Sequence, residues 1–370
     1  MQIQDAVTVD PGGATIAVRP SASIDLGADR IPARRRLVLR TAVGLVIGSG
    51  LVLVFLKLIN LHAALQSLAH LHVGLALLSG LVFLSAYVVR ALRWRRFLAP
   101  DRLPVRRVVS IYMVAVFLNW ALPVQGGELA KSAMLRRTNG IPVSRSLATV
   151  SMDKSMDLLP GVALLAVVPF AHLHLSGTLW VMLLLASTGF LGIIVVLAFS
   201  AWKRETALSF VSRTLTLTLP KRISTRITPF VANFVDTMLE LVRRPRLMIG
   251  ASLYTAVAAS LDALFCYLAF HAVGASISLA VAFYGYTFYN LAFILPTPPG
   301  HVGTNEVVGL LVFAGVFGVS RSSVGAMFLF SHPWTGLLMT SSGLLGLKAV
   351  GLRLPAAMAI RSSSSDEAEG

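Results

Sequence analysis

The chain has 370 residues, of which 56% are apolar and only 13% are charged. An average soluble domain is about 45–50% apolar and about a quarter charged, so this composition excludes a soluble enzyme, a disordered chain and a free nucleic-acid-binding protein. The apolar residues form long runs, each close to the roughly 20 residues that a helix needs to cross a bilayer. The sequence therefore predicts an all-α polytopic membrane protein.

The net charge of +16 does not indicate a nucleic-acid partner, because the cations cluster beside the apolar runs. Clusters of this kind mark the cytoplasmic ends of membrane spans. We expect both chain ends in the cytoplasm: a disordered tail over residues 1–36 and a polar tail over residues 351–370. The transmembrane domain is predicted between them, over residues 37–350.

The first two predicted spans cross the membrane in opposite directions, and the next apolar run is too short for a simple crossing. Residues 37–59 are predicted to cross outward and residues 73–89 to return, joined by a short neutral link. The run over residues 108–122 is then apolar for only 15 residues, and cations flank it on both sides. A single crossing would place the second group of cations outside. A re-entrant hairpin, entering through 108–122 and returning through 127–137, keeps both groups in the cytoplasm.

The middle of the chain predicts a further pair of crossings over residues 156–172 and 179–200. The following segment, residues 203–246, is rich in cations and carries apolar side chains at helical spacing. We expect it to form an amphipathic helix on the cytoplasmic face. Residues 247–270 are then predicted to cross outward.

The last third repeats the interruption. A short apolar helix over residues 279–295 is followed by another over 306–319, and residues 324–350 complete the domain. The two short helices form either a second hairpin, entering from outside, or two full crossings, and charge counting fits both. We favour about six full spans with two opposed re-entrant hairpins.

The two interruptions share a pattern that suggests an inverted repeat. In each, an apolar helix containing an asparagine ends at Leu-Pro, and a glycine-rich turn leads to a glutamate that opens the next helix. The residues at the breaks are Pro123, Gly126 and Gly127 in the first, and Pro296, Gly300 and Gly303 in the second. Broken helices at corresponding places of two repeats are typical of the midplane binding site of a transporter.

Four acidic side chains fall at membrane depth, where an ionised carboxylate must be paired, protonated or hydrated. Glu128 and Glu306 open the helices after the breaks, and we favour a functional role for them over simple helix capping. Asp157 could instead form a solvated ion pair with Lys154 at a helix start. Asp262 could be a hydrogen-bonded packing residue.

Few other motifs point to chemistry. His332 precedes Pro333, and its simplest role is to bond backbone that the proline frees in a kinked helix. The sequence contains no nucleotide-binding loop, hydrolase elbow or zinc-protease motif. We therefore expect neither an enzyme nor a bound metal or cofactor.

As a set, four motifs give the chain a family resemblance. They are Arg90-Ala91-Leu92-Arg93-Trp94, then Asn119 to Pro123 with Gly127-Glu128-Leu129-Ala130-Lys131, then Asp153-Lys154-Ser155-Met156-Asp157, and Leu295-Pro296 with Gly300, Gly303 and Glu306. Over residues 37–350 the chain resembles the lysylphosphatidylglycerol synthase transmembrane-region family of flippase-like bacterial membrane proteins. The resemblance implies location in the inner membrane and passage of lipids through a cavity lined by the broken helices.

The resemblance implies functional roles for Glu128, Asp157 and Glu306, supported by Asn119, Arg93 and Lys154. The chain departs from the family pattern at Lys131 and Lys154, where arginine is usual and would bind phosphate in a bidentate manner. His332 likewise lies where an arginine is common. No aminoacyl-transferase domain follows residue 350, so we do not expect synthesis of lysyl-phosphatidylglycerol.

These inferences favour a flippase or transporter for a phospholipid or a hopanoid-type lipid. In this hypothesis Glu128 and Glu306 change protonation or partner as the cavity opens alternately, and Lys131 and Lys154 attract an anionic headgroup. One alternative is an intramembrane lipid-modifying enzyme with Glu128 or Asp157 as general base. Another is a non-catalytic subunit that recruits a lipid-synthesis enzyme through residues 203–246. Membrane lipids and such enzymes are the expected partners.

Overall fold

A computed structural model describes residues 33–101, 103–122, 126–161, 202–218, 221–291 and 297–352, together with single residues between 163 and 200. Contacts divide the chain into two units, Met1–Leu39 and Arg40–Gly370. The described part of the first unit, residues 33–39, is helical. The packing described below lies within the second unit.

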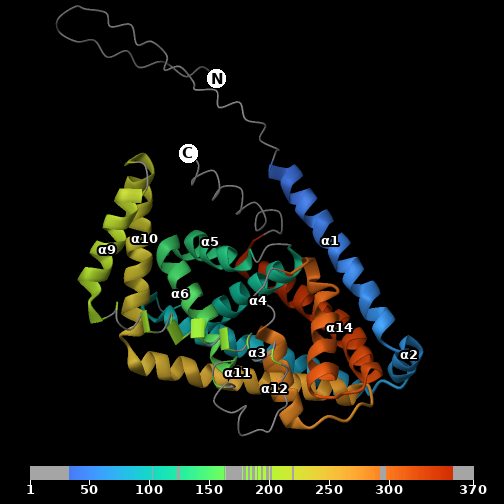
Figure 1. Ribbon diagram of the computed structural model, residues 1–370. Helices are drawn as coiled ribbons and strands as arrows, with labels where there is room; N and C mark the ends of the chain where they lie inside the picture. The colour runs from blue at the N-terminus through green and yellow to red at the C-terminus, as the bar shows by residue number, and fades with distance from the viewer. Residues whose placement is uncertain are drawn as a thin grey trace, which may run out of the picture. The chain divides into compact units, whose positions relative to one another are not determined.

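The described residues form helices and no strands, which confirms the predicted all-α membrane fold (Figure 1). The α-helices are α1 Ala33–Leu58, α2 Leu61–Ala69, α3 Val73–Phe97, α4 Val105–Ala121, α5 Gly127–Asn139, α6 Val143–Met156, α9 Arg204–Thr218, α10 Lys221–Val242, α11 Pro245–Ala272, α12 Leu279–Leu291, α13 Thr304–Gly309 and α14 Arg321–Val350. Three short helices complete the set: η1 Ala99–Asp101, η3 Pro299–His301 and the π-helix η4 Leu310–Val316.

Two of the described helices, α3 and α11, are long and apolar enough to cross a membrane. A third candidate is the pair formed by residues 42–58 of α1 and α2, which bend by 89° at their junction. Large apolar side chains such as Leu77 and Leu81 of α3 are exposed. Such side chains are stable when they face lipid. The number of complete crossings stays a prediction.

The structure differs from the sequence expectation in the first link. Residues 60–71 are not a plain loop, because they contain the nine-residue helix α2. The side chain of Asn60 caps this helix and accepts a hydrogen bond from the Ala63 amide at 3.1 Å. Several predicted features lie wholly or largely outside the described residues. They are the spans 156–172 and 179–200, both tails, Pro123 and Pro296.

The interrupted segments have the expected elements. The first consists of α4 and α5, and the second of α12, η3, α13 and η4, so Glu128 and Glu306 both lie in the first turn of a helix. The two interruptions meet at Trp120, near the end of α4. Ring atoms of Trp120 lie 3.9 Å from the position that a Cβ of Gly300 would occupy, and 2.8 Å from that of Gly336 on α14.

Glycines bring α4 and α14 into close contact. A Cβ on Gly343 would lie 2.3 Å from Cβ of Phe117, and one on Gly346 would lie 2.7 Å from the Ser110 carbonyl oxygen. Helices approach this closely only where small residues line the interface, as is common in membrane proteins. This packing, together with the contact between α3 and α11, holds the walls of a central cavity.

Candidate functional site

A cavity of about 660 Å³ lies among α3, α4, α5, α6, α11, α12 and α14. Seven of the eight predicted substrate-site residues line it: Arg93, Asn119, Glu128, Lys131, Lys154, Asp157 and Asp262. The eighth, Glu306, contacts His332, which itself lines the cavity. The structure thus brings the predicted residues to one place, while their roles in transport stay predictions.

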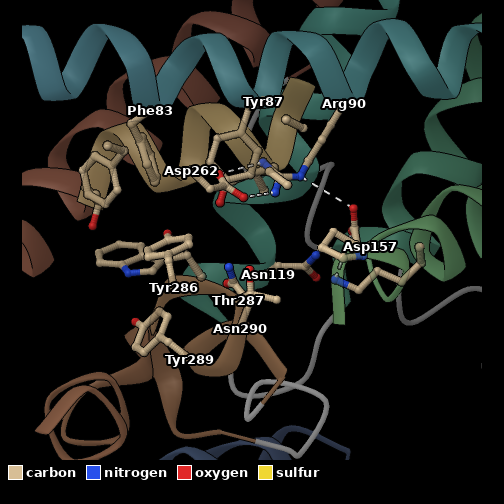
Figure 2. A pocket seen from close by; sticks show the side chains of 18 of the residues that line it. Phe83, Tyr87, Arg90, Asn119, Asp157, Asp262, Tyr286, Thr287, Tyr289 and Asn290 are labelled. Carbon is tan, nitrogen blue, oxygen red and sulfur yellow. Dashed lines mark hydrogen bonds and ion pairs between the residues drawn. The ribbon is translucent and has the colours of Figure 1, made fainter. Parts of the chain in front are cut away.

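Arg90 of α3 lies between two acidic side chains, Asp262 and Asp157, and contacts both. Its guanidinium forms a bidentate pair with Asp262 of α11, with Nη1 at 3.2 Å from Oδ1 and Nη2 bonded to Oδ2. Nε of Arg90 lies 3.6 Å from Oδ1 of Asp157. Figure 2 shows this chain of charges along one wall of the cavity. Asp262 is therefore not a simple packing residue, because its partner is a cation on another helix.

Arg93 is one turn further along α3, and only 1% of its side chain is exposed. Its Nε donates to Oδ1 of Asp153 at 2.8 Å, and its Nη1 donates to Oγ1 of Thr255 at 2.8 Å. Its Nη2 donates to Oδ1 of Asp157 at 2.8 Å and to the Asp153 carbonyl at 2.9 Å. Every nitrogen of the guanidinium has a partner, so Arg93 is fixed in place.

Lys131 of α5 extends the network to the first interruption. Its Nζ lies 2.9 Å from Oε2 of Glu128 and 3.9 Å from Oδ2 of Asp153. The same ammonium group lies 3.9 Å from the ring centroid of Tyr112, a cation–π contact that is strong where water is excluded. Only 3% of the Lys131 side chain is exposed, so it holds the helix after the break against α6 rather than reaching into the cytoplasm.

Asn119 closes the first interruption from the α4 side. Its Nδ2 donates to Oε1 of Glu128 at 3.2 Å, and its Oδ1 accepts from the Gly127 amide at 2.7 Å. Glu128 is thus bonded from both sides, by an amide and by an ammonium group. Helix capping alone would leave the Glu128 side chain to the amides of its own helix.

Lys154 and Asp157 form the ion pair that the sequence allowed, but at the end of a helix rather than at a helix start. They lie at the C-terminal end of α6, where Asp157 is the capping residue. Lys154 is 58% exposed and its Nζ is 4.0 Å from Oδ2 of Asp157, whereas the other carboxylate oxygen receives Arg93. Asp157 therefore belongs to the buried network, and Lys154 is its exposed edge.

The network as a whole is electrically balanced. Its cations are Arg90, Arg93, Lys131 and Lys154, and its anions are Glu128, Asp153, Asp157 and Asp262. Four charges of each sign compensate one another, which is what buried ionised groups require. A ligand that bears charge must therefore exchange partners with these pairs when it binds.

Aromatic side chains form much of the remaining wall. They include Phe83, Tyr87, Tyr112, Trp120, Tyr286 and Tyr289. Figure 2 shows Tyr286 and Tyr289 projecting from α12 on the side of the cavity away from Asp157. The sequence interpretation missed these residues, although the spacing of Tyr286 and Tyr289 by three places them on one face of a helix. The cavity thus has a charged part and an aromatic part.

The second interruption is bound to α14 through one histidine. Nδ1 of His332 bonds Oε1 of Glu306, and Nε2 lies 2.7 Å from the Gly300 carbonyl oxygen. His332 therefore bonds the interruption itself rather than the backbone that Pro333 frees. Glu306 is 8% exposed. Among the described residues, no group of His, Cys, Asp and Glu has the arrangement of a metal site.

Comparison of the sequence with known proteins finds a family model and a relative that match the chain. A family model described as the lysylphosphatidylglycerol synthase TM region matches residues 41–343. A UPF0104 membrane protein of Pyrococcus horikoshii is 24% identical over 295 residues, which cover 75% of this chain and 88% of the relative. No solved structure matches the chain.

Proposed function

Because this chain belongs to the lysylphosphatidylglycerol synthase transmembrane-region family, we propose that it moves a lipid or lipid-linked substrate across the bacterial inner membrane. The headgroup passes through the central cavity, while the apolar tail stays in the surrounding lipid. Both phospholipids and hopanoid-type lipids fit this description. Transport proceeds without covalent change to the substrate.

The observation that carries this proposal is the composition of the cavity wall. A volume of about 660 Å³ falls in the range of roughly 300–1,000 Å³ that small-molecule sites occupy, and it suits a lipid headgroup. A polar headgroup needs partners at membrane depth, and the paired charges around Arg90 and Asp157 supply both signs. The aromatic side chains on the other wall suit the junction between headgroup and tail.

The contacts of the acidic residues favour transport over lipid-modifying chemistry. A general base needs a carboxylate that is free to take a proton. Glu128 is held by Lys131 and Asn119, and Asp157 receives Arg93, so neither is free in this arrangement. The recruiting role of residues 203–246 remains a separate hypothesis, which an interaction assay with a variant lacking that segment would test.

The test is to reconstitute the purified protein in vesicles that contain a fluorescent lipid and to follow the movement of the lipid between leaflets. We expect faster movement than in vesicles without protein, and a loss of at least about tenfold in Asp157→Asn. Glu240→Gln, in an exposed ion pair on α10, is the matched control. Wild-type rates no faster than empty vesicles, across phospholipids and hopanoid-type lipids, would contradict the proposal.

A further inference from the structure

His332 is placed between two oxygen atoms that belong to the second interruption. Its Nε2 lies 2.7 Å from the carbonyl oxygen of Gly300, and its Nδ1 bonds Oε1 of Glu306. A carbonyl oxygen cannot donate a hydrogen bond, so Nε2 must carry a hydrogen. The state of the contact between Nδ1 and Oε1 then depends on one further proton.

That proton is present in either form of the pair. If His332 is neutral, its hydrogen is on Nε2 and Nδ1 is a bare acceptor, so Glu306 must be protonated and donate. If Glu306 is ionised, Nδ1 must carry the hydrogen and the imidazole is a cation. In both cases the pair is neutral overall and holds one proton between Nδ1 and Oε1.

We propose that His332 and Glu306 form a proton-binding site that couples lipid movement to a proton gradient. This inference rests on the proposed function, and it names the proton as the coupling ion. The cavity gives the site access to water, because His332 lines the cavity wall.

Loss of the shared proton breaks the contact. The proton leaves Nδ1 or Oε1 for a water molecule in the cavity, and two acceptor atoms then face each other. The second carboxylate oxygen of Glu306 is buried and has no hydrogen-bond partner among the described residues, so the resulting negative charge is poorly stabilised. The two side chains must separate, and α13 loses its polar link to α14.

The position of His332 lets this local change move a helix. Pro333 follows it inside α14, and a proline removes one backbone hydrogen bond and makes a helix easier to bend. The other nitrogen of the same ring binds Gly300, which lies against Trp120 of the first interruption. Proton release therefore frees Glu306 from α14, while the Nε2–H group still holds Gly300 next to the point where both interruptions meet.

Among the described residues, Glu306 is the acidic side chain that contacts His332, and the other titratable groups nearby are as follows. His301 of η3 interacts electrostatically with His332 and with Lys154, and Tyr289 of α12 interacts electrostatically with Glu306. His301 bonds Thr297, with Oγ1 at 2.6 Å from Nδ1. On the side of α1, Gly48 and Leu51 lie against Gly303 and carry no charge.

The proton site can be tested directly, without transport, by nitrogen NMR of the histidines in the full-length protein in detergent or lipid. We expect the His332 signal, assigned by its loss in His332→Gln, to report hydrogen on Nε2 and a shared hydrogen at Nδ1 near neutral pH. Glu306→Gln should replace the Nδ1 signal with that of an ordinary neutral ring. A wild-type His332 with a bare, unshared Nδ1 at neutral pH would overturn the proposal.

Coupling is tested in vesicles with a pH difference of one unit across the membrane. One coupled proton changes the lipid transfer rate by at most about tenfold per pH unit, and we expect about three- to tenfold, reversed in sign when the gradient is inverted. Glu306→Gln should lose this response, whereas Glu128→Gln should transport more slowly but keep it. Wild-type lipid movement that ignores the gradient would overturn the coupling. Lipid movement absent in every vesicle would instead count against the proposed function, and the NMR signal would still decide the proton site.

Discussion

Asn119 and Glu128 close the first interruption across the gap between α4 and α5, with Nδ2 of the amide at 3.2 Å from Oε1 of the carboxylate. The two residues are nine positions apart, so this bond spans the break itself. The amide is suited to its place because it donates to Glu128 with one atom and accepts from the Gly127 backbone with the other.

We expect Asn119→Asp to disturb this closure strongly. The new carboxylate keeps an acceptor for Gly127 but replaces the donor with a second negative charge beside Glu128. Lipid transfer should fall at least about tenfold, with a lower melting temperature. Glu128→Gln in the same chain should restore part of both, because its amide can donate to the aspartate. If the double variant transfers lipid no faster and melts no higher than Asn119→Asp, the hydrogen bond from Asn119 to Glu128 is not the reason that an amide is needed here.

Gly127 tests how closely the two helices of the first interruption must approach. A Cβ at this position would lie 2.1 Å from the Ala115 carbonyl oxygen, so Gly127→Ala forces α5 away from α4. Overpacking of this kind costs about 1–3 kcal/mol. Gly50→Ala in α1 is the matched control, since nothing lies within 4 Å of its added Cβ. Thermal unfolding in detergent should separate the two variants, and equal melting temperatures would contradict the prediction.

Arg93 tests the buried charge network. Removing one partner of a buried ion pair costs about 3–5 kcal/mol, because the other charge is left unpaired. Arg93→Gln leaves Asp153 and Asp157 without their main donor, and we expect a loss of that size in the free energy of unfolding. Arg244→Gln, which breaks an exposed pair with Glu240, should cost less than about 1 kcal/mol.

Arg93→Lys distinguishes geometry from charge at the same position. A lysine keeps the positive charge but lacks the planar fork that reaches Asp153, Asp157 and Thr255 together. We expect it to recover less than half of the stability lost in Arg93→Gln, measured by chemical unfolding. Full recovery would mean that only the sign of the charge matters.

The predicted orientation can be checked by labelling single cysteines. Cys266 is buried and is the one cysteine in the sequence, so a Cys266→Ser variant provides a background that should not react with the label. Ser209 on α9 and Gln66 on α2 are both exposed. With the cytoplasmic side predicted at residues 203–246, a membrane-impermeant maleimide should reach Ser209→Cys only from the cytoplasm and Gln66→Cys only from outside. The reverse pattern would refute the orientation.

Local sequence patterns were enough to predict most elements of the fold. The short helices around both interruptions end within a few residues of their predicted limits, because Leu-Pro steps and glycines act over neighbouring residues. The prediction of a plain link over residues 60–71 was wrong. A nine-residue helix such as α2 has too few turns for its periodicity to be recognised in the sequence. Three acids of the charged wall, Glu128, Asp157 and Asp262, stand out in the sequence because acids at membrane depth are rare. Arg90 and Asp153 were not predicted as site residues.

The pairing of those charges could not be predicted. Arg90 and Arg93 belong to a cluster of arginines, and such a cluster looks the same in sequence whether it contacts water or buried carboxylates. Their partners are 60 to 172 residues away, and no local pattern encodes such distances. Likewise, the sequence links His332 to its neighbouring proline, whereas in the structure it binds Glu306, 26 residues earlier.

The bidentate bond between Arg90 and Asp262 also constrains how the protein is made. The ribosome adds Arg90 172 residues before Asp262, so the guanidinium lacks this acceptor while those residues are being synthesised. A nascent chain that stops short of α11 holds a cation that the hydrocarbon layer disfavours. A chain truncated before α11 leaves Arg90 without Asp262, so we expect it to pack less stably than the full-length protein.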